Sequence, residues 1–357
     1  MYRKTGKILG MFEELIRAWD GEQVVIRYDE PSGAWIFVCI HSTALGPAGG
    51  GTRMRVYDSP ADGLADAMRL SQAMTLKLAV ANAGRGGGKA VLAVPELPTG
   101  ERRRELLLAY GRLVASLGGT YRTAGDMNVS PADLDVVKEV CPWVYGTTTG
   151  GGNSGVGTAR AVFHGIRASV AHLFGDDDLR GRRVLVQGAG AVGADLVRFL
   201  RDAGADVLVA DVDEARARAT GAELVPAADA VTTECDVYAP CAVGGTLNAD
   251  TIPRLRCRIV AGSANNQLAT PEDAARLRDA GILYAPDFVI NAGGVIQLVG
   301  LEDRGLGDAE LEAEYAGVGE TLRRIFADAD ALGITTAEAA ERLAAERVSQ
   351  KREEPVA

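Results

Sequence analysis

The sequence predicts an α/β protein of two domains, an N-terminal mixed-sheet domain and a C-terminal doubly wound domain. A chain of 357 residues with 47% hydrophobic and 24% charged residues has enough apolar side chains for two cores. Its 44 glycines and 5% aromatic content favour tight turns and close helix–strand packing over a β-sandwich. From residue 183 onward, strand-like and helix-like segments alternate, as in a parallel sheet covered on both faces.

The first domain opens with a predicted β-hairpin. Residues 23–28 and 34–41 are rich in β-branched and aromatic side chains, and the turn residues of 29–33 separate them. Pro60 then begins a helix whose apolar residues recur near helical spacing, with Lys77 close to its C-terminal end. The glycine run 84–88 ends that helix.

The rest of this domain mixes strands and helices. We expect a short buried strand at 90–94, a helix at 101–117 and a strand from Tyr121. Another helix follows, with Ser130 as its N-cap and a proline at its first position, and ends before Pro142.

A glycine-rich stretch predicts the domain boundary. Residues 146–157 contain six glycines and three threonines, a composition typical of an interdomain hinge and cleft lining. We therefore expect one domain at 1–147, joined by the C-terminal helices of about 310–357, and a second domain at 148–309.

The second domain follows the order of a doubly wound sheet. A helix at 158–173 precedes a strand at 183–187, a helix at 191–203 and a strand at 206–210. We expect further strands and helices, the strands at Val237, Ile259 and Leu283 and the helices from Asn291, Asp308 and Thr336. We expect the last two helices to pack back across the first domain.

Charge and cysteine content restrict the partners. A net charge of −10 and a pI near 5.0 disfavour nucleic acid and anionic membranes. The basic run 102–104 precedes three leucines and reads as the solvated start of a helix. Five scattered cysteines without a C-x-x-C pair indicate reduced thiols and no metal site. No leader or membrane-spanning segment is recognisable, so we expect a cytoplasmic protein.

A dinucleotide-binding fingerprint begins the second domain. A strand leads directly into a helix through Gly188-Ala189-Gly190-Ala191-Val192-Gly193. Glycines there permit a tight turn, the approach of backbone N–H groups to a pyrophosphate, and close helix packing. Asp211 ends the next strand 23 residues after Gly188, where a carboxylate can bind the ribose hydroxyls and repel a 2′-phosphate. The sequence therefore predicts a Rossmann-like domain that binds NAD in preference to NADP.

Two lysines stand out in the first domain. Lys77 and Lys89 are twelve residues apart, and Lys89 lies between a glycine run and a buried strand. Burial there would desolvate the ammonium and lower its pKa, which would suit a general base.

Several blocks together resemble the glutamate/leucine/phenylalanine/valine dehydrogenase family. They run in family order along most of the chain, at 45–53, 73–77, 86–89, 123–128, 188–193, 261–266, 285–288 and 291–294. The resemblance implies a homo-oligomer assembled through the first domain, and oxidative deamination of an L-amino acid to a 2-oxo acid, ammonia and NADH.

The resemblance also implies residue roles. Lys77 would hold the substrate carboxylate, Lys89 would activate water, and Asp126 would exchange protons with the amino group. The remaining substrate contacts would come from Gly49, Gly50, Gly51, Met74, Asn128, Asn266 and Asn291. NAD would be held by Thr158, the six fingerprint residues, Asp211, Val212, Cys241, Ala242, Ala264, Asn265 and Asn291. Crowding by Lys77 and partial burial would lower the pKa of Lys89, giving deamination an alkaline optimum.

The substrate prediction rests on pocket size. Leucine-specific relatives carry a bulky residue at the position of Gly49, so the glycine leaves room and favours phenylalanine. Asn128 and residues 298–300 also resemble actinobacterial phenylalanine dehydrogenases more than other members of the family. Leucine or valine and the larger tryptophan are the alternatives.

Two other classes compete with this assignment. A 2-hydroxyacid dehydrogenase needs a histidine acid/base, and none of His41, His164 and His172 lies in a His–Asp context in the sequence. A non-catalytic NAD-binding regulator would not need Lys77, Lys89 and Asp126 together.

Overall fold

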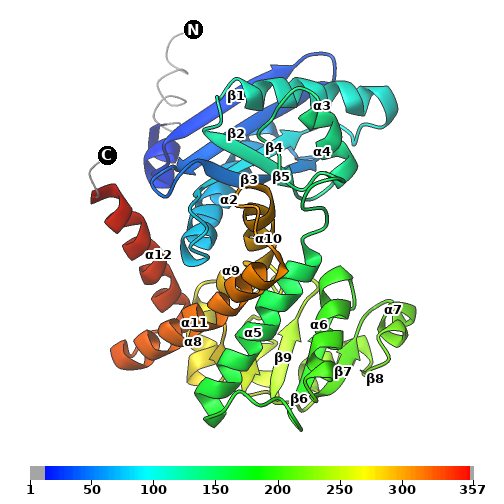
Figure 1. Cartoon of the computed structure of the whole chain (residues 1–357), viewed down its shortest axis with the longest axis vertical. Coiled ribbons are helices and arrows are strands. Elements are labelled where there is room, and N and C mark those ends of the chain that lie inside the picture. Colours follow the sequence, from blue (N-terminus) through cyan, green and yellow to red (C-terminus); the bar gives the residue numbers. More distant parts are fainter. Residues whose placement is uncertain (1–12, 354–357) are drawn as a thin grey trace. The chain divides into compact units, whose positions relative to one another are not determined.

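The computed structural model describes residues 13–353, which form parts of two compact units (Figure 1). The first unit comprises Met1–Gly152 and Ala344–Ala357, and the second comprises Asn153–Leu343. The division falls inside the glycine-rich stretch 146–157. No helix within the described residues is long and apolar enough to cross a bilayer.

A five-stranded mixed sheet forms the centre of the first unit. Its strands are β1 (Gln23–Asp29), β2 (Ala34–Ser42), β3 (Ala48–Arg55), β4 (Gly86–Ala93) and β5 (Tyr121–Gly125), in the order β1-β2-β4-β3-β5. β1, β2 and β4 pair in antiparallel fashion, whereas β3 is parallel to both β4 and β5. The sheet is mixed, as predicted.

The sequence prediction missed β3 and began β4 four residues too late. Both segments are glycine-rich, and glycine is depleted in strands because it loses most conformational freedom and offers no side chain to pack. Here the glycines are needed for close approach. A Cβ atom at Gly87 would lie 2.2 Å from the backbone nitrogen of Thr75 in the covering helix.

Helices cover both faces of this sheet. α2 (Pro60–Val80) packs on one face, where it buries Phe37, Cys39, Val91 and Ala93. α3 (Gly100–Ala115) and α4 (Pro131–Lys138) cover the other face, which presents the alternate strand residues. The predicted N-cap of α4 is confirmed, since Ser130 and Asp133 form a capping box.

A six-stranded parallel sheet forms the second unit, in the order β11-β10-β9-β6-β7-β8. The strands are β6 (Arg183–Gln187), β7 (Asp206–Ala210), β8 (Glu223–Leu224), β9 (Val237–Pro240), β10 (Ile259–Val260) and β11 (Leu283–Tyr284). Its helices include α5 (Gly155–Phe174), α6 (Ala191–Asp202), α7 (Glu214–Ala219), α8 (Glu272–Asp279), α9 (Asp287–Ile290) and α10 (Gly293–Glu302). The order reverses at β6, and this topology confirms the predicted Rossmann-like domain.

The last two helices divide differently from the expectation. α11 (Asp308–Leu332) belongs to the second unit and packs along α5, where Gly165 lets the Leu322 side chain approach closely. The apolar stripe of α11 therefore already has a partner. α12 (Thr336–Glu353) reaches the first unit from Ala344 onward, and Arg347 donates hydrogen bonds to the carbonyls of Ala79 and Val80 at the end of α2.

Candidate active site

Three charged side chains of the first unit lie on the sheet face that α2 covers. Lys89 alternates with Ala90 along β4, Arg53 alternates with Thr52 along β3, and Asp126 follows the end of β5. The side chains of Thr52 and Ala90 pack on the opposite face, so Arg53 and Lys89 project toward α2. The parallel register of β3, β4 and β5 brings the three together.

Lys89 is buried and paired with a carboxylate. Only 8% of its side chain is exposed, and its Nζ lies 2.9 Å from Oδ2 of Asp126. Burial lowers the pKa of Lys89 below the usual lysine value, against the opposing pull of Asp126. The nearby cation Arg53 also helps to lower this pKa.

Asp126 receives two cations on one oxygen. Its Oδ2 accepts from Lys89 and, at 3.0 Å, from Nε of Arg53. Burial raises the pKa of Asp126, but Lys89 and Arg53 together outweigh that effect, and the net shift is downward. The carboxyl group is therefore ionised at neutral pH.

The glycines of β3 leave space for this pair. A Cβ atom at Gly51 would lie 3.0 Å from the Asp126 Cβ and 2.6 Å from the Gly125 carbonyl oxygen. At Gly50 a Cβ atom would overlap the Gly88 carbonyl, and the Gly50 carbonyl itself accepts from Tyr121. A Cβ atom at Gly49 would make ordinary contact, 3.7 Å, with Leu78 of α2.

The other predicted substrate residues of this unit have mixed placements. Met74 and Lys77 lie one turn apart on α2, and both are partly buried. Asn128 is exposed in a left-handed turn, and its amide nitrogen donates to the Met54 carbonyl at 3.0 Å. That bond gives Asn128 a role in holding the turn after Asp126.

The fingerprint glycines of the second unit are individually explained by the structure. Gly188 has a φ of 103°, and a Cβ atom there would lie 2.9 Å from the Ala242 side chain. A Cβ atom at Gly193 would be 1.8 Å from the Gly188 carbonyl oxygen, so α6 can approach β6 only through a glycine. Gly190 has open space beside it, where a pyrophosphate could approach. These features fit a dinucleotide.

Asp211 is oriented by the backbone at the end of β7. Its two oxygens accept from the N–H groups of Ala189 at 2.6 Å and Asp213 at 2.8 Å. These hydrogen bonds lower the pKa of Asp211 and keep it ionised. The carboxylate retains lone pairs for ribose hydroxyls, as the predicted NAD site requires.

The asparagines near β10 form a compact polar group. Asn291 donates to the Ser263 carbonyl at 3.1 Å and to Oδ1 of Asn265 at 2.8 Å. The Asn291 Oδ1 is buried and has no hydrogen-bond partner among residues 13–353. Asn266 lies in a left-handed turn that accepts from Gly245, so Asn265 is the member of the pair that contacts Asn291.

The remaining predicted cofactor residues border the same strand ends. Thr158 bonds back to the Ser154 carbonyl within α5. Cys241 and Ala242 follow β9, and the Ala264 N–H donates to the Pro240 carbonyl. Val212, which follows Asp211, is 94% exposed, and Val243 is 64% exposed.

Comparison with known proteins agrees with these two sites. Residues 28–156 match the Glu/Leu/Phe/Val dehydrogenase dimerisation domain, and residues 209–302 match the Glutamate/Leucine/Phenylalanine/Valine dehydrogenase domain. The chain belongs to this dehydrogenase family. It is therefore an amino-acid dehydrogenase, and NAD is its cofactor.

Three relatives of this dehydrogenase cover nearly its whole length. Valine dehydrogenase of Streptomyces virginiae is 46% identical over 343 residues, covering 93% of this chain and 94% of its own. Leucine dehydrogenase of Geobacillus stearothermophilus is 39% identical, covering 94% and 93%. The solved structure of L-tryptophan dehydrogenase from Nostoc punctiforme is 37% identical, with a TM-score of 0.85 and coverage of 95% and 99%. These relatives do not support the expected closeness to phenylalanine dehydrogenases.

Sequence reasoning missed part of the dehydrogenase's charged network. Arg53 stood inside a matched glycine block without an assigned role, and its NH1 also lies 3.0 Å from Asp66 on α2. Asp66 further accepts from the Tyr57 hydroxyl and from Arg69. The arginine could have been noticed beside the glycines, but nothing in the local sequence marks Asp66, because helix packing brings it to the sheet.

The interpretation of the histidines, that none lies in a His–Asp context, needs one correction. His164 lies 2.9 Å from Glu312, and His172 lies 3.3 Å from Asp330, so two of the three do pair with carboxylates. Both acids come from α11, about 150 residues later in the chain, where the local sequence gives no sign of the pairing. These pairs join α5 to α11 as packing contacts within the second unit.

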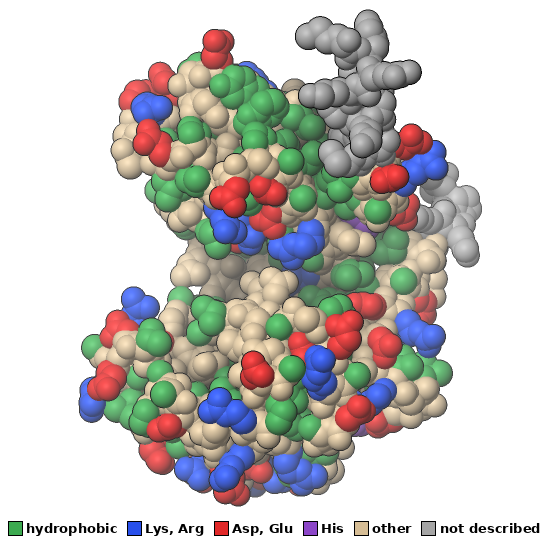
Figure 2. Space-filling model, turned by 180° about the vertical axis from the view of Figure 1, so that it is seen from behind, with side chains coloured by type: hydrophobic (Ala, Val, Ile, Leu, Met, Phe, Trp, Pro, Cys, Tyr) green, Lys and Arg blue, Asp and Glu red, His purple; other side chains and the backbone are tan. Residues whose placement is uncertain are grey.

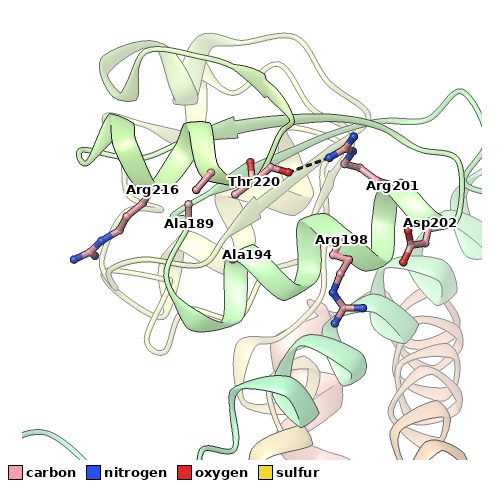
Figure 3. Close-up of a pocket in the computed structure, with 8 residues that line it drawn as sticks. Ala189, Ala194, Arg198, Arg201, Asp202, Arg216 and Thr220 are labelled. Atoms are coloured by element: carbon pink, nitrogen blue, oxygen red, sulfur yellow. Dashed lines mark hydrogen bonds between the residues drawn. The ribbon is translucent and has the colours of Figure 1, made fainter.

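A cavity of about 650 Å³ lies beside the fingerprint of the dehydrogenase, between α6 and α7. Figure 3 shows that its arginines diverge: Arg216 and Arg198 point away from one another, and Arg201 bonds to the Thr220 carbonyl. No group of three or more His, Cys, Asp or Glu side chains within the described residues could hold a metal ion.

The surface charges of the dehydrogenase are mixed. On the face in Figure 2, Lys and Arg side chains are scattered among Asp and Glu side chains, without a continuous basic field. This pattern agrees with the acidic net charge of −10.

Proposed function

We propose that this enzyme oxidatively deaminates a branched-chain aliphatic L-amino acid, valine or leucine, to the 2-oxo acid, ammonia and NADH. The single observation that carries the chemistry is the buried Lys89–Asp126 pair, with Nζ and Oδ2 at 2.9 Å. A buried amine with a lowered pKa can be neutral near neutral pH, and an adjacent ionised carboxylate can handle a second proton.

Each residue has a defined task in this reaction. Lys77 binds the α-carboxylate, and bound NAD supplies the acceptor for the hydride that leaves Cα. Neutral Lys89 takes a proton from water as the water oxygen adds to the resulting iminium carbon. Asp126 takes a proton from the substrate ammonium as the hydride leaves Cα, and returns it to the amino group after water has added. The amine then leaves as ammonia while the hydroxyl proton is lost and the 2-oxo acid forms. Asn265 and Asn291 position the nicotinamide and the substrate.

The proposed side-chain preference follows the relatives and the apolar surroundings. The relatives named valine and leucine dehydrogenase are 46% and 39% identical to this chain. Leu78 lies beside Gly49, and Met74 is partly buried on the same helix. The second candidate substrate is tryptophan. Gly49 leaves room for a larger side chain, and the similar solved structure is an L-tryptophan dehydrogenase.

A substrate panel tests this proposal. We expect kcat/KM with NAD to be about tenfold or more higher for valine or leucine than for phenylalanine or tryptophan, since each misfitting group costs roughly 1–3 kcal/mol. Glutamate and lactate should give no turnover. A preference for an aromatic amino acid would support the second candidate, and no turnover of any amino acid would refute the proposed chemistry.

The pH dependence tests the role of Lys89. Only the neutral amine can accept a proton, so kcat/KM for deamination should fall as pH drops through the pKa of Lys89. Because burial lowers that pKa, we expect the midpoint of this limb below the usual lysine value of about 10.4. A rate independent of pH between about 6 and 11 would contradict this role.

We also propose that the enzyme is a homo-oligomer that assembles through the first unit. β1 is an edge strand, and Ile26, Tyr28 and Trp35 on β1 and β2 are 44%, 51% and 36% exposed. A second copy of the chain could cover these apolar side chains. Ile26→Lys should reduce the mass measured by sedimentation. Leu97→Lys, at another exposed apolar residue of this unit, should not. An unchanged mass for Ile26→Lys would exclude this surface.

A further inference from the structure

Arg53 connects two partly buried carboxylates through separate nitrogens. Its Nε lies 3.0 Å from Asp126 Oδ2, its NH1 lies 3.0 Å from Asp66 Oδ2, and its side chain is 16% exposed. The roles assigned to Lys77, Lys89 and Asp126 do not use this residue. Its planar guanidinium can hold both carboxylates in fixed directions, which a lysine ammonium cannot do.

Asp66 anchors the far side of this guanidinium. It lies on α2 and is 14% exposed. Its Oδ2 also accepts from the Tyr57 hydroxyl at 2.8 Å, and its Oδ1 accepts from Arg69 at 2.8 Å. With three donors around it, Asp66 keeps one orientation and therefore fixes Arg53 against Asp126.

The charge balance explains why Arg53 matters to Lys89. If Lys89 and Asp126 formed an isolated pair, removing the lysine proton would leave an unpaired carboxylate in a buried site, at a high desolvation cost. Arg53 remains charged throughout the pH range of proteins. It therefore supplies a permanent counterion to Asp126 when Lys89 is neutral.

We propose that Arg53 is a positioning residue for the deamination: it holds and neutralises Asp126, so that Lys89 can lose its proton without leaving a buried carboxylate unpaired. This proposal rests on the proposed function of the Lys89–Asp126 pair. Before any proton is transferred, Asp126 is a carboxylate held by Arg53, and the free lone pair of Lys89 is available for the proton of the attacking water.

The other charged groups around the pair are few. α2 contributes Asp66, Arg69, Asp62 and Lys77. β2 contributes Cys39, which pairs with Lys89 in the sheet register, and burial raises the pKa of its thiol to about 12, so it stays neutral. Arg53, which lies on β3, is a cation in direct contact with Asp126, and its charge lowers the pKa of Lys89.

The test measures the titration of Lys89 directly. The chain has six lysines, so 13C-labelled lysine gives few NMR signals, and Lys89→Met assigns the one of interest. In Arg53→Gln, we expect the Lys89 midpoint to rise by about one pH unit or more. The pH at which kcat/KM falls on acidification should rise by a similar amount. Asp66→Asn should lower kcat because Arg53 is released from its anchor, but it should not raise the midpoint, because the Asp66 charge itself raises the pKa of Lys89.

Matched controls separate this effect from general damage. Arg69→Gln removes a contact to the outer oxygen of Asp66 without touching Asp126, and the midpoint should stay at the wild-type value. NADH affinity should be unchanged in all variants. Arg53→Lys should keep the Lys89 midpoint within about half a pH unit of wild type, because the positive charge stays. It should lower kcat, because an ammonium cannot hold both carboxylates as the planar guanidinium does.

An unchanged Lys89 midpoint in folded Arg53→Gln would overturn the proposal. If Arg53→Gln failed to fold, a wild-type kcat in Asp66→Asn would overturn it. If the wild-type enzyme turned over no amino acid, the proposed function would fail. The NMR midpoints would still report whether Arg53 controls the proton on Lys89, so the two failures can be distinguished.

Discussion

The two units build their sites by opposite means. In the first unit, charged side chains meet on a covered sheet face, where Lys89 and Arg53 lie 2.9 Å and 3.0 Å from the same oxygen of Asp126. In the second unit, the site is formed mainly by glycines, which have no side chain, and by backbone N–H groups at the ends of β6 and β7. The first arrangement controls where protons reside, and the second controls shape.

This contrast predicts different responses to mutation. A change of charge in the first unit should alter rates and pH profiles while NADH binding remains. A change of shape in the second unit should alter NADH binding while the titration of Lys89 remains.

Removing the lysine amine should have the largest effect. Lys89→Ala deletes the proposed base, and we expect kcat for deamination to fall roughly 10²–10⁴-fold. The dissociation constant of NADH, measured by fluorescence titration, should stay within about twofold of wild type. Lys138→Ala, which changes a lysine of α4, is the control and should retain full activity. A Lys89→Ala enzyme with wild-type kcat would remove the basis for the comparison.

Two glycines of the fingerprint give a matched pair in the second unit. A Cβ atom at Gly193 would lie 1.8 Å from a backbone oxygen, so Gly193→Ala should lose about 1–3 kcal/mol of stability and most NADH binding. Gly190→Ala meets no atom within 4 Å, so it should keep the wild-type Tm while still weakening NADH. Thermal unfolding and fluorescence titration separate these effects. Equal losses of Tm in both variants would contradict the distinct glycine roles.

Removing the negative charge of Asp211 should reduce the preference for NAD over NADP. Asp211→Asn preserves the side-chain shape but removes the charge that repels a 2′-phosphate. The ratio of kcat/KM for NAD to that for NADP should fall roughly tenfold or more. Asp213→Asn, two residues away, should leave the ratio near its wild-type value. An unchanged ratio in Asp211→Asn would show that another residue excludes NADP.

The predictable features of this protein are those encoded by neighbouring residues. The fingerprint lies within six residues, and its strand and helix were placed correctly because the local pattern and the turn glycines agree. Lys89 was singled out for the same reason, since a glycine run and an apolar strand flank it. The capping box of α4 is also local.

The features that were missed depend on contacts between distant segments. β3 has a glycine-rich sequence that no strand pattern describes, and it becomes a strand because β4 and β5 lie on either side. Asp66 reaches Arg53 through the packing of α2 on the sheet. α11 was assigned to the wrong domain because its apolar stripe does not reveal that α5 is its partner.

The smallest effect concerns two exposed valines at the ends of β7 and β9. Val212 and Val243 are 94% and 64% exposed, although apolar side chains lose stabilisation when they remain in water. We expect the adenine ring of NAD to cover Val243. Val243→Ser should therefore weaken NADH binding about fivefold, equivalent to about 1 kcal/mol of apolar burial. Leu97→Ser, an exposed apolar position of the first unit, should leave binding unchanged. Equal affinities for Val243→Ser and the wild-type enzyme would show that the adenine lies elsewhere, and that backbone shape alone accounts for binding in the second unit.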